Sequence, residues 1–539
     1  MKLLKLPSFP YFDRKFIIVA LFHWFFSFFT DRFIFTFSIT NLPLSKLVLW
    51  CSIKGLSLIL LLVMWQFISY IIKKRDRNTI LFIKYSLIYF AIMLFFLLLT
   101  WPGVWRWDEF FVLEKATRLV VNPWQHSLTS ILFMTALQIF PFPAGILLFQ
   151  NIIMSMVVGY IVFKMSRFID KKRYLYLVYV PFLSLAVLDS NLHPLRLSLY
   201  SYLELFFITF ILFMRIDKRK WSIKLVIMSS FLISILATWR GESVYYVFLA
   251  PLVLILLFKS KLLNIHKLIL VVTTFIMFSG LSSFQSYFIK DQKESDRYEL
   301  TAIVEPLLPI VKEASLQDDP RLKDINQVIN VELFMKHNRG IGAFWNEKEL
   351  IRSNYTQEEF STFKNTYYEL VFSYLPVFFH ERIDTFLATS AFFHDQLNTQ
   401  RDTSKLYSFR GPPYDRFKQY SLNHPPYVDV REKTIKLLEG RDLSNYTKTT
   451  ISYHVFYNVI PPLMAIFIIF IISLIKKRWT NCLLTILVLL KVPLVFAAAP
   501  DHWFMYYFPV YLIGYVFLTL FLVMFFYNKK YESKVDFFV

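Results

Sequence analysis

The chain has 539 residues, of which 56% are hydrophobic, and its 59 basic and 38 acidic residues give a net charge of +21. Apolar runs of about 20 residues, each long enough to cross a hydrocarbon core, recur along it and exclude an ordinary soluble protein. The positive charge does not indicate a nucleic-acid partner, because residues 290–450 hold 22 basic and 24 acidic residues. The excess lies in short clusters between apolar runs, as the positive-inside rule expects of cytoplasmic loops. The predicted fold class is an all-α polytopic membrane protein.

Basic clusters and apolar runs alternate along the chain, and together they predict the topology. A basic N-terminus before the first run and Lys73, Lys74 and Arg75 after the second place both ends of this pair in the cytoplasm. The third run then delivers residues 100–134 to the outside as the first external loop. We expect about twelve transmembrane helices with both termini cytoplasmic. The predicted crossings are residues 16–29, 47–72, 80–99, 146–165, 174–188, 197–214, 223–238, 244–258, 268–288, 455–475, 483–499 and 505–526.

Two stretches between the crossings are predicted not to span. Residues 128–140 are apolar but too short, and Pro141 and Pro143 end them, so we expect an interfacial or re-entrant helix. Residues 290–452 are polar, with amphipathic helical spacing in part, and we expect one large, mostly helical extracytoplasmic insertion. The predicted domains are an N-terminal transmembrane module (1–289), this soluble segment (290–452) and a C-terminal transmembrane module (453–539).

Acidic residues outside the soluble segment gather on one predicted side of the membrane. Of the 14 acidic residues outside residues 290–450, seven fall on predicted outward turns. Acidic groups at helix ends facing one compartment can converge on a single pocket, whereas an ion path would distribute them through the bilayer. The seven are Asp31, Asp108, Glu109, Glu114, Asp189, Glu242 and Asp501. The same turns also carry other polar side chains, namely His126, His193, Arg196, Arg240, His502 and Tyr506.

A polar rim above an apolar bundle suits a substrate with a polar head and a lipid tail. Arginine and histidine side chains can hold a phosphate through charge-assisted hydrogen bonds, and a carboxylate can take a proton from an attacking hydroxyl. Tryptophans of the first external loop, among them Trp105 and Trp107, can stack on a sugar face. The reaction that uses all three kinds of group is glycosyl transfer from a polyprenyl-phosphate sugar.

The first external loop, with Trp107, Asp108 and Glu109 followed by a helical stretch parallel to the membrane, resembles that of the GT-C superfamily of integral-membrane glycosyltransferases. Protein O-mannosyltransferases and the aminoarabinose transferase of lipid A carry an Asp-Glu pair in that loop. Residues 122–150 also resemble a segment of GT-C-like bacterial membrane proteins. The resemblance implies that Asp108 is the catalytic base of an inverting transfer. It implies that Glu109 orients the acceptor or the neighbouring backbone.

The resemblance further implies a lipid-linked sugar donor and a glycan, lipid or protein acceptor. It places the protein in the plasma membrane as a multi-pass chain with an extracytoplasmic active site. Some members require a divalent cation, Mg²⁺ or Mn²⁺, which is the one cofactor implied. The loop has no Asp-X-Asp motif, and Cys51 and Cys482 have no metal-ligand spacing, so the sequence assigns no metal ligands. Because no motif marks the phosphate ligands, His126, Arg196 and Arg240 are assigned from position and charge.

Several candidate residues also have a structural interpretation. The pair Asp108 and Glu109 could be a solvated loop pair, and the loop tryptophans could anchor helices at the membrane interface. His126 could cap the helix that follows it. Arg196 and Arg240 could reach lipid head groups with their long side chains.

Glu204 and Lys491 differ from the other charged residues, because each lies near the middle of a predicted crossing. An ion inside the membrane is costly enough to need a partner or water. We expect the two to pair or to line the donor cavity.

Two other classes of function fit the same topology. A transporter or lipid flippase would also have about twelve spans and cytoplasmic termini, but carriers rely on glycine-rich broken helices. This chain has 11 glycines in 539 residues and no repeat between its halves. A polysaccharide polymerase or ligase also combines many spans with a large external loop, where Arg401, Arg410 and Arg416 would bind substrate.

Overall fold

The computed structural model describes residues 13–35, 42–122, 124–169, 171–288, 292–392, 425–442 and 449–527. These residues form helices, and the only strand pairing among them is two isolated β-bridges. Nine helices are long and apolar enough to cross a membrane, or ten if one bent pair counts as a single span. The protein is therefore an all-helical, multi-pass membrane protein. Arg401, Arg410 and Arg416 lie outside the described residues.

The nine helices are α1 (Arg14–Ile34), α2 (Leu44–Lys74), α3 (Arg77–Leu99), α6 (Pro143–Met165), α9 (Arg196–Ile216), α12 (Asn264–Phe288), α21 with α22 (Ile451–Phe456 and Ile460–Ile475), α23 with α24 (Trp479–Leu489 and Lys491–Ala498) and η6 with α25 (Phe504–Tyr507 and Phe508–Tyr527). In the bent pair, α7 and η2 (Lys172–Tyr176 and Leu177–Leu183) meet α8 (Leu185–Asn191) at 64°. The shorter apolar helices are α5 (Ser127–Ile139), α10 (Ile223–Trp239) and η3 with α11 (Gly241–Ser243 and Tyr246–Leu257).

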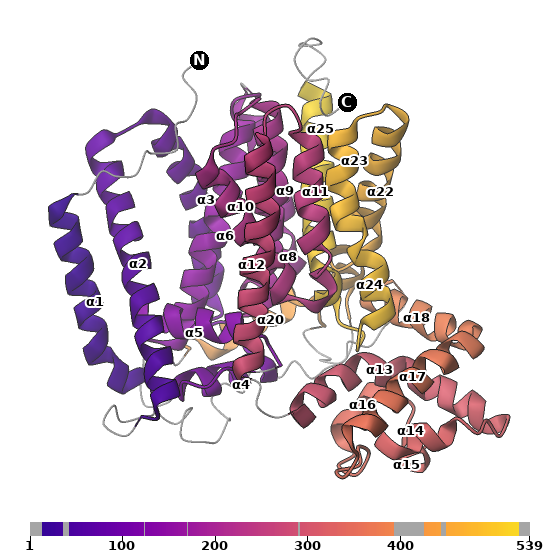
Figure 1. Ribbon diagram of the computed structural model, residues 1–539. Helices are drawn as coiled ribbons and strands as arrows, with labels where there is room; N and C mark the ends of the chain where they lie inside the picture. Colours follow the sequence, from indigo (N-terminus) through magenta and orange to yellow (C-terminus); the bar gives the residue numbers. More distant parts are fainter. Residues whose placement is uncertain are drawn as a thin grey trace.

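The predicted number of crossings exceeds the number of helices that are long enough to span. Two predicted crossings form α10 and α11, which have 17 and 12 residues. They are short because Arg240 takes an extended conformation, with φ −136° and ψ 128°, and separates them at a turn. Figure 1 shows both helices packed lengthwise beside α9 and α12. The structure thus supports nine or ten spans, and the count of twelve stays a prediction.

The two ends of the bundle differ in charge and in what covers them. α1 begins and α25 ends at one end of the bundle, drawn at the top in Figure 1. α2, whose last turn carries Lys73 and Lys74, also ends here. The opposite end holds α4 (Trp107–Thr117), α5 and a separate helical unit. The alternation predicted from the basic clusters is present in the fold, while the side that faces the cytoplasm stays a prediction.

Close packing of α3 against α6 forms one part of the bundle core. A Cβ atom added to Gly159 of α6 would lie 2.0 Å from Ser86 Oγ of α3, so only glycine permits this approach. Small residues at such contacts let membrane helices pack closely. Nearby, the side-chain amide of Asn191 donates to the hydroxyls of Tyr89 and Tyr202, at 2.9 and 2.7 Å. These bonds join α3, α8 and α9.

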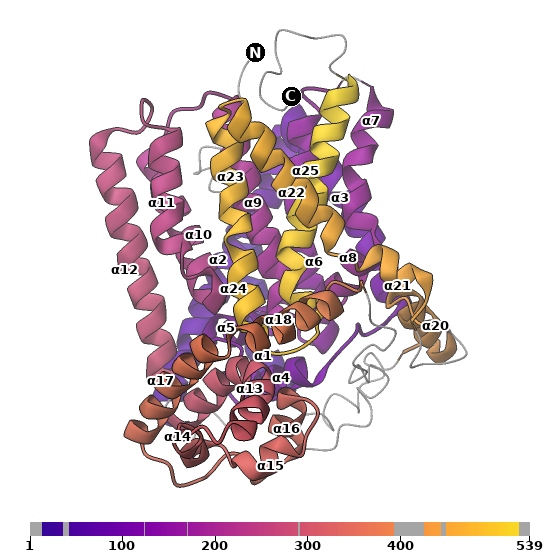
Figure 2. The ribbon, with the colours of Figure 1, turned by 90° about the vertical axis from the view of Figure 1, so that its right-hand side faces the viewer.

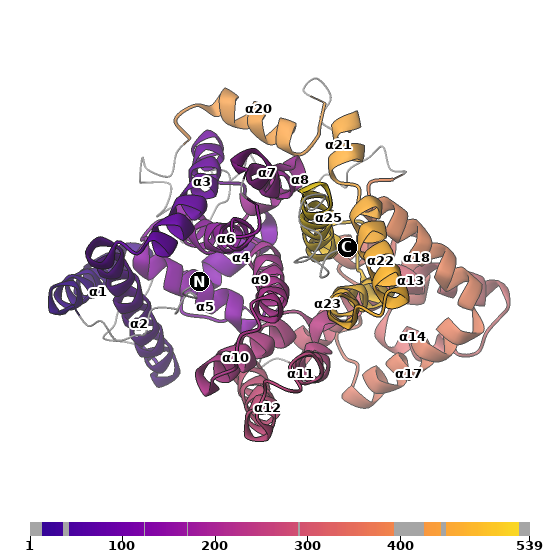
Figure 3. The ribbon, with the colours of Figure 1, turned by 90° about the horizontal axis from the view of Figure 1, so that it is seen from above.

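The hairpin of α1 and α2 lies beside the bundle, as Figure 3 shows, and is joined to it through α5. Lys54 Nζ lies 2.8 Å from Asp31 Oδ2, and both side chains are buried. Gln138 of α5 donates to Asp31 Oδ1 at 2.9 Å and accepts from Lys54. Asp31 therefore has a structural role as the partner of Lys54 and Gln138. α5 has 13 residues and is largely buried at its end of the bundle, as predicted for a helix that does not span.

The helical unit forms its own apolar core next to the bundle (Figures 1 and 2). It contains α13 (Gln292–Leu316), α14 (Leu322–Val328), α15 (Val331–Met335), α16 (Gly340–Asn346), α17 (Gln357–Ser373) and α18 (Leu375–Thr389). α20 (Val428–Leu438) lies apart from the unit and holds the start of the first external loop. Its buried Arg431 donates to the carbonyl oxygens of Thr100 and Gly103, at 3.2 and 3.0 Å.

Candidate active site

The first external loop turns into α4, whose first turn carries both predicted catalytic carboxylates. Glu109 is buried, and its Oε2 accepts a hydrogen bond from the backbone N–H of Arg106 at 2.6 Å. A glutamate at this position caps the start of a helix, where backbone donors have no partner within the helix. Glu109 therefore orients the neighbouring backbone, one of the two roles that the sequence left open for it.

Asp108 is partly exposed and lies among hydrogen-bond donors and cations. Its Oδ2 accepts a hydrogen bond from the side-chain amide of Gln125 at 3.2 Å. Burial raises the pKa of Asp108, while the nearby guanidinium groups of Arg196 and Arg106 lower it. Burial is the larger of these effects, so the pKa of Asp108 lies above its usual value and the carboxyl takes up a proton more readily than an ordinary aspartate. A group that accepts and releases a proton in this way can act as a general base.

Protonation of Glu109 is expected to change the stability of the fold with pH. Burial raises the pKa of Glu109 from 4.5 to about 7, so the folded state binds a proton that the unfolded state has lost. The contribution of this group to stability therefore falls as the pH rises from 4.5 to about 7. We expect Glu109→Gln to unfold at a higher temperature than the wild type at pH 8, because the amide keeps an acceptor without the charge.

Differential scanning fluorimetry at pH 5 and pH 8 measures this effect. Glu109→Ala serves as the comparison: it loses the cap at both pH values, which costs about 1 kcal/mol, but it has no carboxyl to titrate, so its unfolding temperature should change less between pH 5 and pH 8 than that of the wild type. A Glu109→Gln variant that unfolds below the wild type at pH 8 contradicts the protonation argument.

The two arginines predicted to hold phosphate have different partners. Arg240 is buried, and its Nε forms an ion pair with Glu242, so its charge is neutralised locally. Arg196 begins α9 and donates to the carbonyl oxygen of Trp239 and the hydroxyl of Tyr298, each at 3.4 Å. Among the described residues, no carboxylate lies within 4 Å of Arg196. Arg196 is therefore the better placed of the two to bind an anion.

His193 is fully buried next to Arg106. Its Nε2 is 3.5 Å from both Arg106 Nη2 and Asp189 Oδ1. Gln150 donates to its carbonyl oxygen at 3.0 Å, and Tyr457 donates to Asp189 Oδ2 at 2.9 Å. These contacts suit a residue that positions Arg106 more than one that meets a substrate directly.

Trp105 belongs to the core of the loop. It is 1% exposed, stacks on Phe110 at a centroid distance of 5.5 Å and packs edge-on against Phe133. A buried ring in these contacts has no face left for a sugar, which favours a structural role. The side chain of Trp107 lies outside the described part of the chain.

His126 caps α5, which was the structural alternative to substrate binding. Its Nδ1 accepts from the backbone N–H of Leu128 at 3.2 Å. Burial, and then the charge of Arg196, lowers the pKa of His126 to about 4. The ring is therefore neutral near pH 7 and keeps the lone pair that the cap requires.

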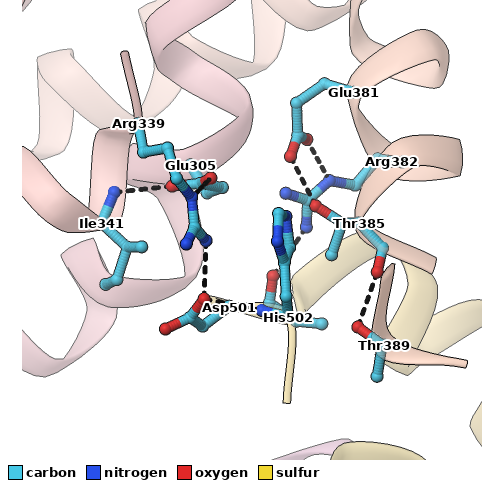
Figure 4. Close-up of polar contacts among 10 residues, drawn as sticks. Glu305, Arg339, Ile341, Glu381, Arg382, Thr385, Thr389, Asp501 and His502 are labelled. Atoms are coloured by element: carbon cyan, nitrogen blue, oxygen red, sulfur yellow. Dashed lines mark hydrogen bonds and ion pairs between the residues drawn. The ribbon is translucent and has the colours of Figure 1, made fainter. Parts of the chain in front are cut away.

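The turn with the last predicted site residues is held by the helical unit (Figure 4). Arg339 Nη2 lies 2.6 Å from Asp501 Oδ1, and its Nε lies 3.1 Å from Glu305 Oε1. Arg382, which is fully buried, donates to the carbonyl oxygen of Ala499 at 2.8 Å. Two arginines of the helical unit thus hold both sides of the turn at Pro500.

The residues that follow Pro500, His502 and Tyr506 among them, lie between this turn and the surroundings of Asp108. The backbone N–H of His502 donates to Asp501 Oδ1 at 2.7 Å. Tyr506 lies within electrostatic range of Asp501, Asp108 and Arg240. The C-terminal turn and the first external loop therefore lie at the same end of the bundle.

Loss of the buried Arg382 should loosen this turn. In Arg382→Met the carbonyl oxygen of Ala499 loses its donor, and an unsatisfied buried group costs about 1–3 kcal/mol. Hydrogen–deuterium exchange should become faster in residues 496–503. Lys336→Met, which removes an exposed pair with Glu332 on the same unit, is the matched control. Equal exchange in both variants would show that Arg382 does not hold the turn.

Four residues near the site were not predicted from the sequence. Arg106 and Gln125 lie inside the first external loop, and the pattern of a helix start with glutamate at its third position could have drawn attention to Arg106. Tyr298 and Arg339 come from the helical unit. No local pattern links them to the loop, because only the docking of the unit brings them there.

The implied Mg²⁺ or Mn²⁺ does not fit the residues around Asp108. Within the described ranges, no group of three or more His, Cys, Asp or Glu side chains could hold a metal ion. Arg196 and Arg106 also place positive charge beside Asp108, and like charges repel a cation.

Comparison with known proteins does not identify the chain. No family model, curated protein or solved structure matches it.

Proposed function

We propose that the protein is a membrane glycosyltransferase that moves a sugar from a polyprenyl-phosphate donor to an extracytoplasmic acceptor. The observation that carries the proposal is that Asp108, in the first turn of α4, and Arg196, at the start of α9, lie within electrostatic range of each other at one end of a membrane bundle. A base and an anion-binding cation at the membrane surface match the two polar parts of this reaction, the acceptor hydroxyl and the donor phosphate. The apolar bundle matches the lipid part of the donor.

In the proposed reaction Asp108 takes the proton of the acceptor hydroxyl as the hydroxyl oxygen attacks the anomeric carbon. The bond between that carbon and the phosphate oxygen breaks, and polyprenyl phosphate leaves with the electron pair. Attack from the opposite face inverts the anomeric carbon. Arg196 binds the phosphate and stabilises the charge that grows on it. Arg106, next to His193, adds a second positive charge.

The proposal includes a topology of twelve crossings, with α10, α11 and the bent pair among them. The protein lies in the plasma membrane with cytoplasmic termini, and the site faces outward. The basic residues at the end of the bundle opposite the site support this orientation through the positive-inside rule. The acceptor is a glycan, a lipid or a protein.

A transporter or flippase is the main alternative. Such proteins use ionisable residues inside the membrane to bind substrate or ions. Glu204 and Lys491 are buried in the bundle, but they bind each other at 2.5 Å. Because their charges are already paired, they favour a structural role over transport.

Purified protein in proteoliposomes, given a polyprenyl-phosphate hexose and an acceptor extract, separates the two functions. The proposal expects release of polyprenyl phosphate and a labelled acceptor, whereas a flippase moves the intact donor between leaflets. Arg196→Gln should raise the KM for the donor. Arg118→Gln is the matched control, because Arg118 lies at the end of α4 and pairs with Glu114. Donor that stays intact under all conditions contradicts the proposal, and parallel reactions with EDTA or added Mg²⁺ test the metal.

A further inference from the structure

Beside Asp108, side-chain contacts lead from the first external loop to the helical unit. Gln125 donates to Asp108 at 3.2 Å, and Trp124 is its neighbour in the chain. The Trp124 ring lies 5.8 Å from the ring of Tyr298, and the Tyr298 hydroxyl accepts from Arg196 at 3.4 Å. Arg196 in turn acts electrostatically on Asp108. The proposed base is thus linked to the Trp124 ring through Gln125, and the anion-binding Arg196 is linked to the Tyr298 ring. The two rings in turn contact each other.

Trp345 of α16 continues this set of aromatic contacts outward from Trp124. Its ring lies 5.7 Å from that of Trp124 and packs edge-on against Phe344. Trp345 is 55% exposed and Tyr298 is 43% exposed, while Trp124 is partly buried against the core of the helical unit. We call Trp124, Tyr298 and Trp345 the aromatic platform. Its two exposed rings are available to a ligand, and the third fixes them in place.

We infer that the aromatic platform binds a carbohydrate chain and presents it as the acceptor to Asp108. A sugar ring has an apolar face of C–H groups that packs on an aromatic ring, and hydroxyls at its edge that need hydrogen-bond partners. The platform offers ring faces, and Gln125, Arg196 and the Tyr298 hydroxyl beside it offer such partners. This inference rests on the proposed glycosyl transfer and selects a glycan from the three acceptor classes.

Two observations favour a glycan over the bilayer as the occupant of the platform. Aromatic belts form at the level where spanning helices meet the interface. Figures 1 and 2 instead show α16, which carries Trp345, farther from the spanning helices than α18. The platform is also joined to Asp108 and Arg196 through polar side chains, and lipid tails would leave these groups without partners.

The platform also explains why the first external loop and the helical unit are fixed to each other. Trp124 belongs to the loop, whereas Tyr298 and Trp345 belong to the helical unit. A sugar chain bound across them would place its end near Asp108 only if both parts keep their relative position. The ion pair of Arg339 with Asp501 contributes to this, because it ties the unit to the bundle.

The test measures glycan binding without donor, so that it is independent of transfer. Full-length protein in nanodiscs, carrying a fluorescent label, is applied to an array of bacterial surface glycans. We expect at least one glycan to bind, with affinity about tenfold lower for Trp345→Ala, as for loss of an aromatic residue at the centre of an interface. Trp345→Phe should lose less, because it keeps a ring. Tyr368→Ala is the matched control, since Tyr368 is 56% exposed on the same unit but away from the platform.

Three results would overturn the inference. The first is the absence of any bound glycan, and the second is a bound glycan whose affinity is unchanged in Trp345→Ala. The third is quenching of Trp345 fluorescence by brominated lipids. The signal of Trp345 is obtained by subtracting the fluorescence of Trp345→Phe from that of the wild type. The last result would assign the platform to the bilayer. Failure of the proposed transfer is seen separately, as glycan binding by the wild type without release of polyprenyl phosphate.

Discussion

Asp108→Asn is expected to lower the rate of glycosyl transfer by about 10²–10⁴-fold, the usual contribution of a general base. The amide keeps an oxygen that can accept the hydrogen bond from Gln125, so the loop should keep its conformation. What the variant loses is the ability to take a proton from the acceptor. The rate at saturating donor and acceptor measures the effect.

The matched control is Glu114→Gln, on the same helix. Glu114 pairs with Arg118, four residues further along α4, so this variant removes a carboxylate of α4 that does not contact Gln125. Full activity in Asp108→Asn, or an equal loss in Glu114→Gln, would contradict the assignment of the base.

The pH dependence gives a second readout of the same residue. The base must be deprotonated, so the rate falls as the pH falls through the pKa of Asp108. Because burial raises that pKa, activity should be lost at a higher pH than for an ordinary aspartate, whose pKa is about 3.9. Arg196 lowers the pKa, so Arg196→Gln should move the loss of activity to higher pH still.

The second large effect is expected at Glu204 and Lys491, which the structure shows to be paired inside the bundle. Lys491 Nζ lies 2.5 Å from Glu204 Oε2 and 3.0 Å from the hydroxyl of Tyr200. Tyr246 donates to Glu204 Oε1 at 2.7 Å, and all four residues are fully buried. Lys491 begins α24 directly after the break that ends α23, so the pair fixes this break to α9. Of the two roles predicted, pairing is confirmed.

Glu204→Gln and Lys491→Met should each destabilise the protein by about 3–5 kcal/mol, because each leaves a buried charge without its partner. The double variant should recover much of this loss, since it removes both charges. Yield and thermal unfolding in detergent measure the effect. Lys336→Met breaks an exposed pair with Glu332 and should cost less than about 1 kcal/mol. Single variants as stable as this control would show that the pair contributes nothing.

The sequence predicts the arrangement of the bundle well because its signals are local. Each apolar run predicts one helix and each basic cluster one turn, and residues 128–140 are too short to span, as α5 is in the structure. The count is less secure where helices break. Residues 223–238 and 244–258 are predicted as separate crossings with Arg240 in the turn between them, but the helices there, α10 and α11, have only 17 and 12 residues.

The site was predictable only in part. Polar turns at one end of a bundle lie on the same side of the membrane, which explains why Asp108 is within electrostatic range of Arg196 and Tyr506, and Tyr506 of Arg240. The partner of each residue depends on side-chain directions that the sequence does not show. Trp105 turns inward, for example, and Arg240 is neutralised by Glu242 two residues later.

The contacts that the helical unit makes with the site cannot be predicted from the sequence. Tyr298 is 102 residues from Arg196, and Arg339 is 162 residues from Asp501. Such contacts depend on how the unit docks, and no periodicity in the chain records that docking.

The fate of the donor lipid is the most direct test of the proposed glycosyl transfer. Purified wild type and Asp108→Asn are reconstituted in the same lipids with a polyprenyl-phosphate hexose and the acceptor, and the lipid products are followed by mass spectrometry. The proposed function predicts that the wild type releases polyprenyl phosphate only when the acceptor is present and that Asp108→Asn releases almost none. Intact donor with the wild type, or equal release by both proteins, would contradict it.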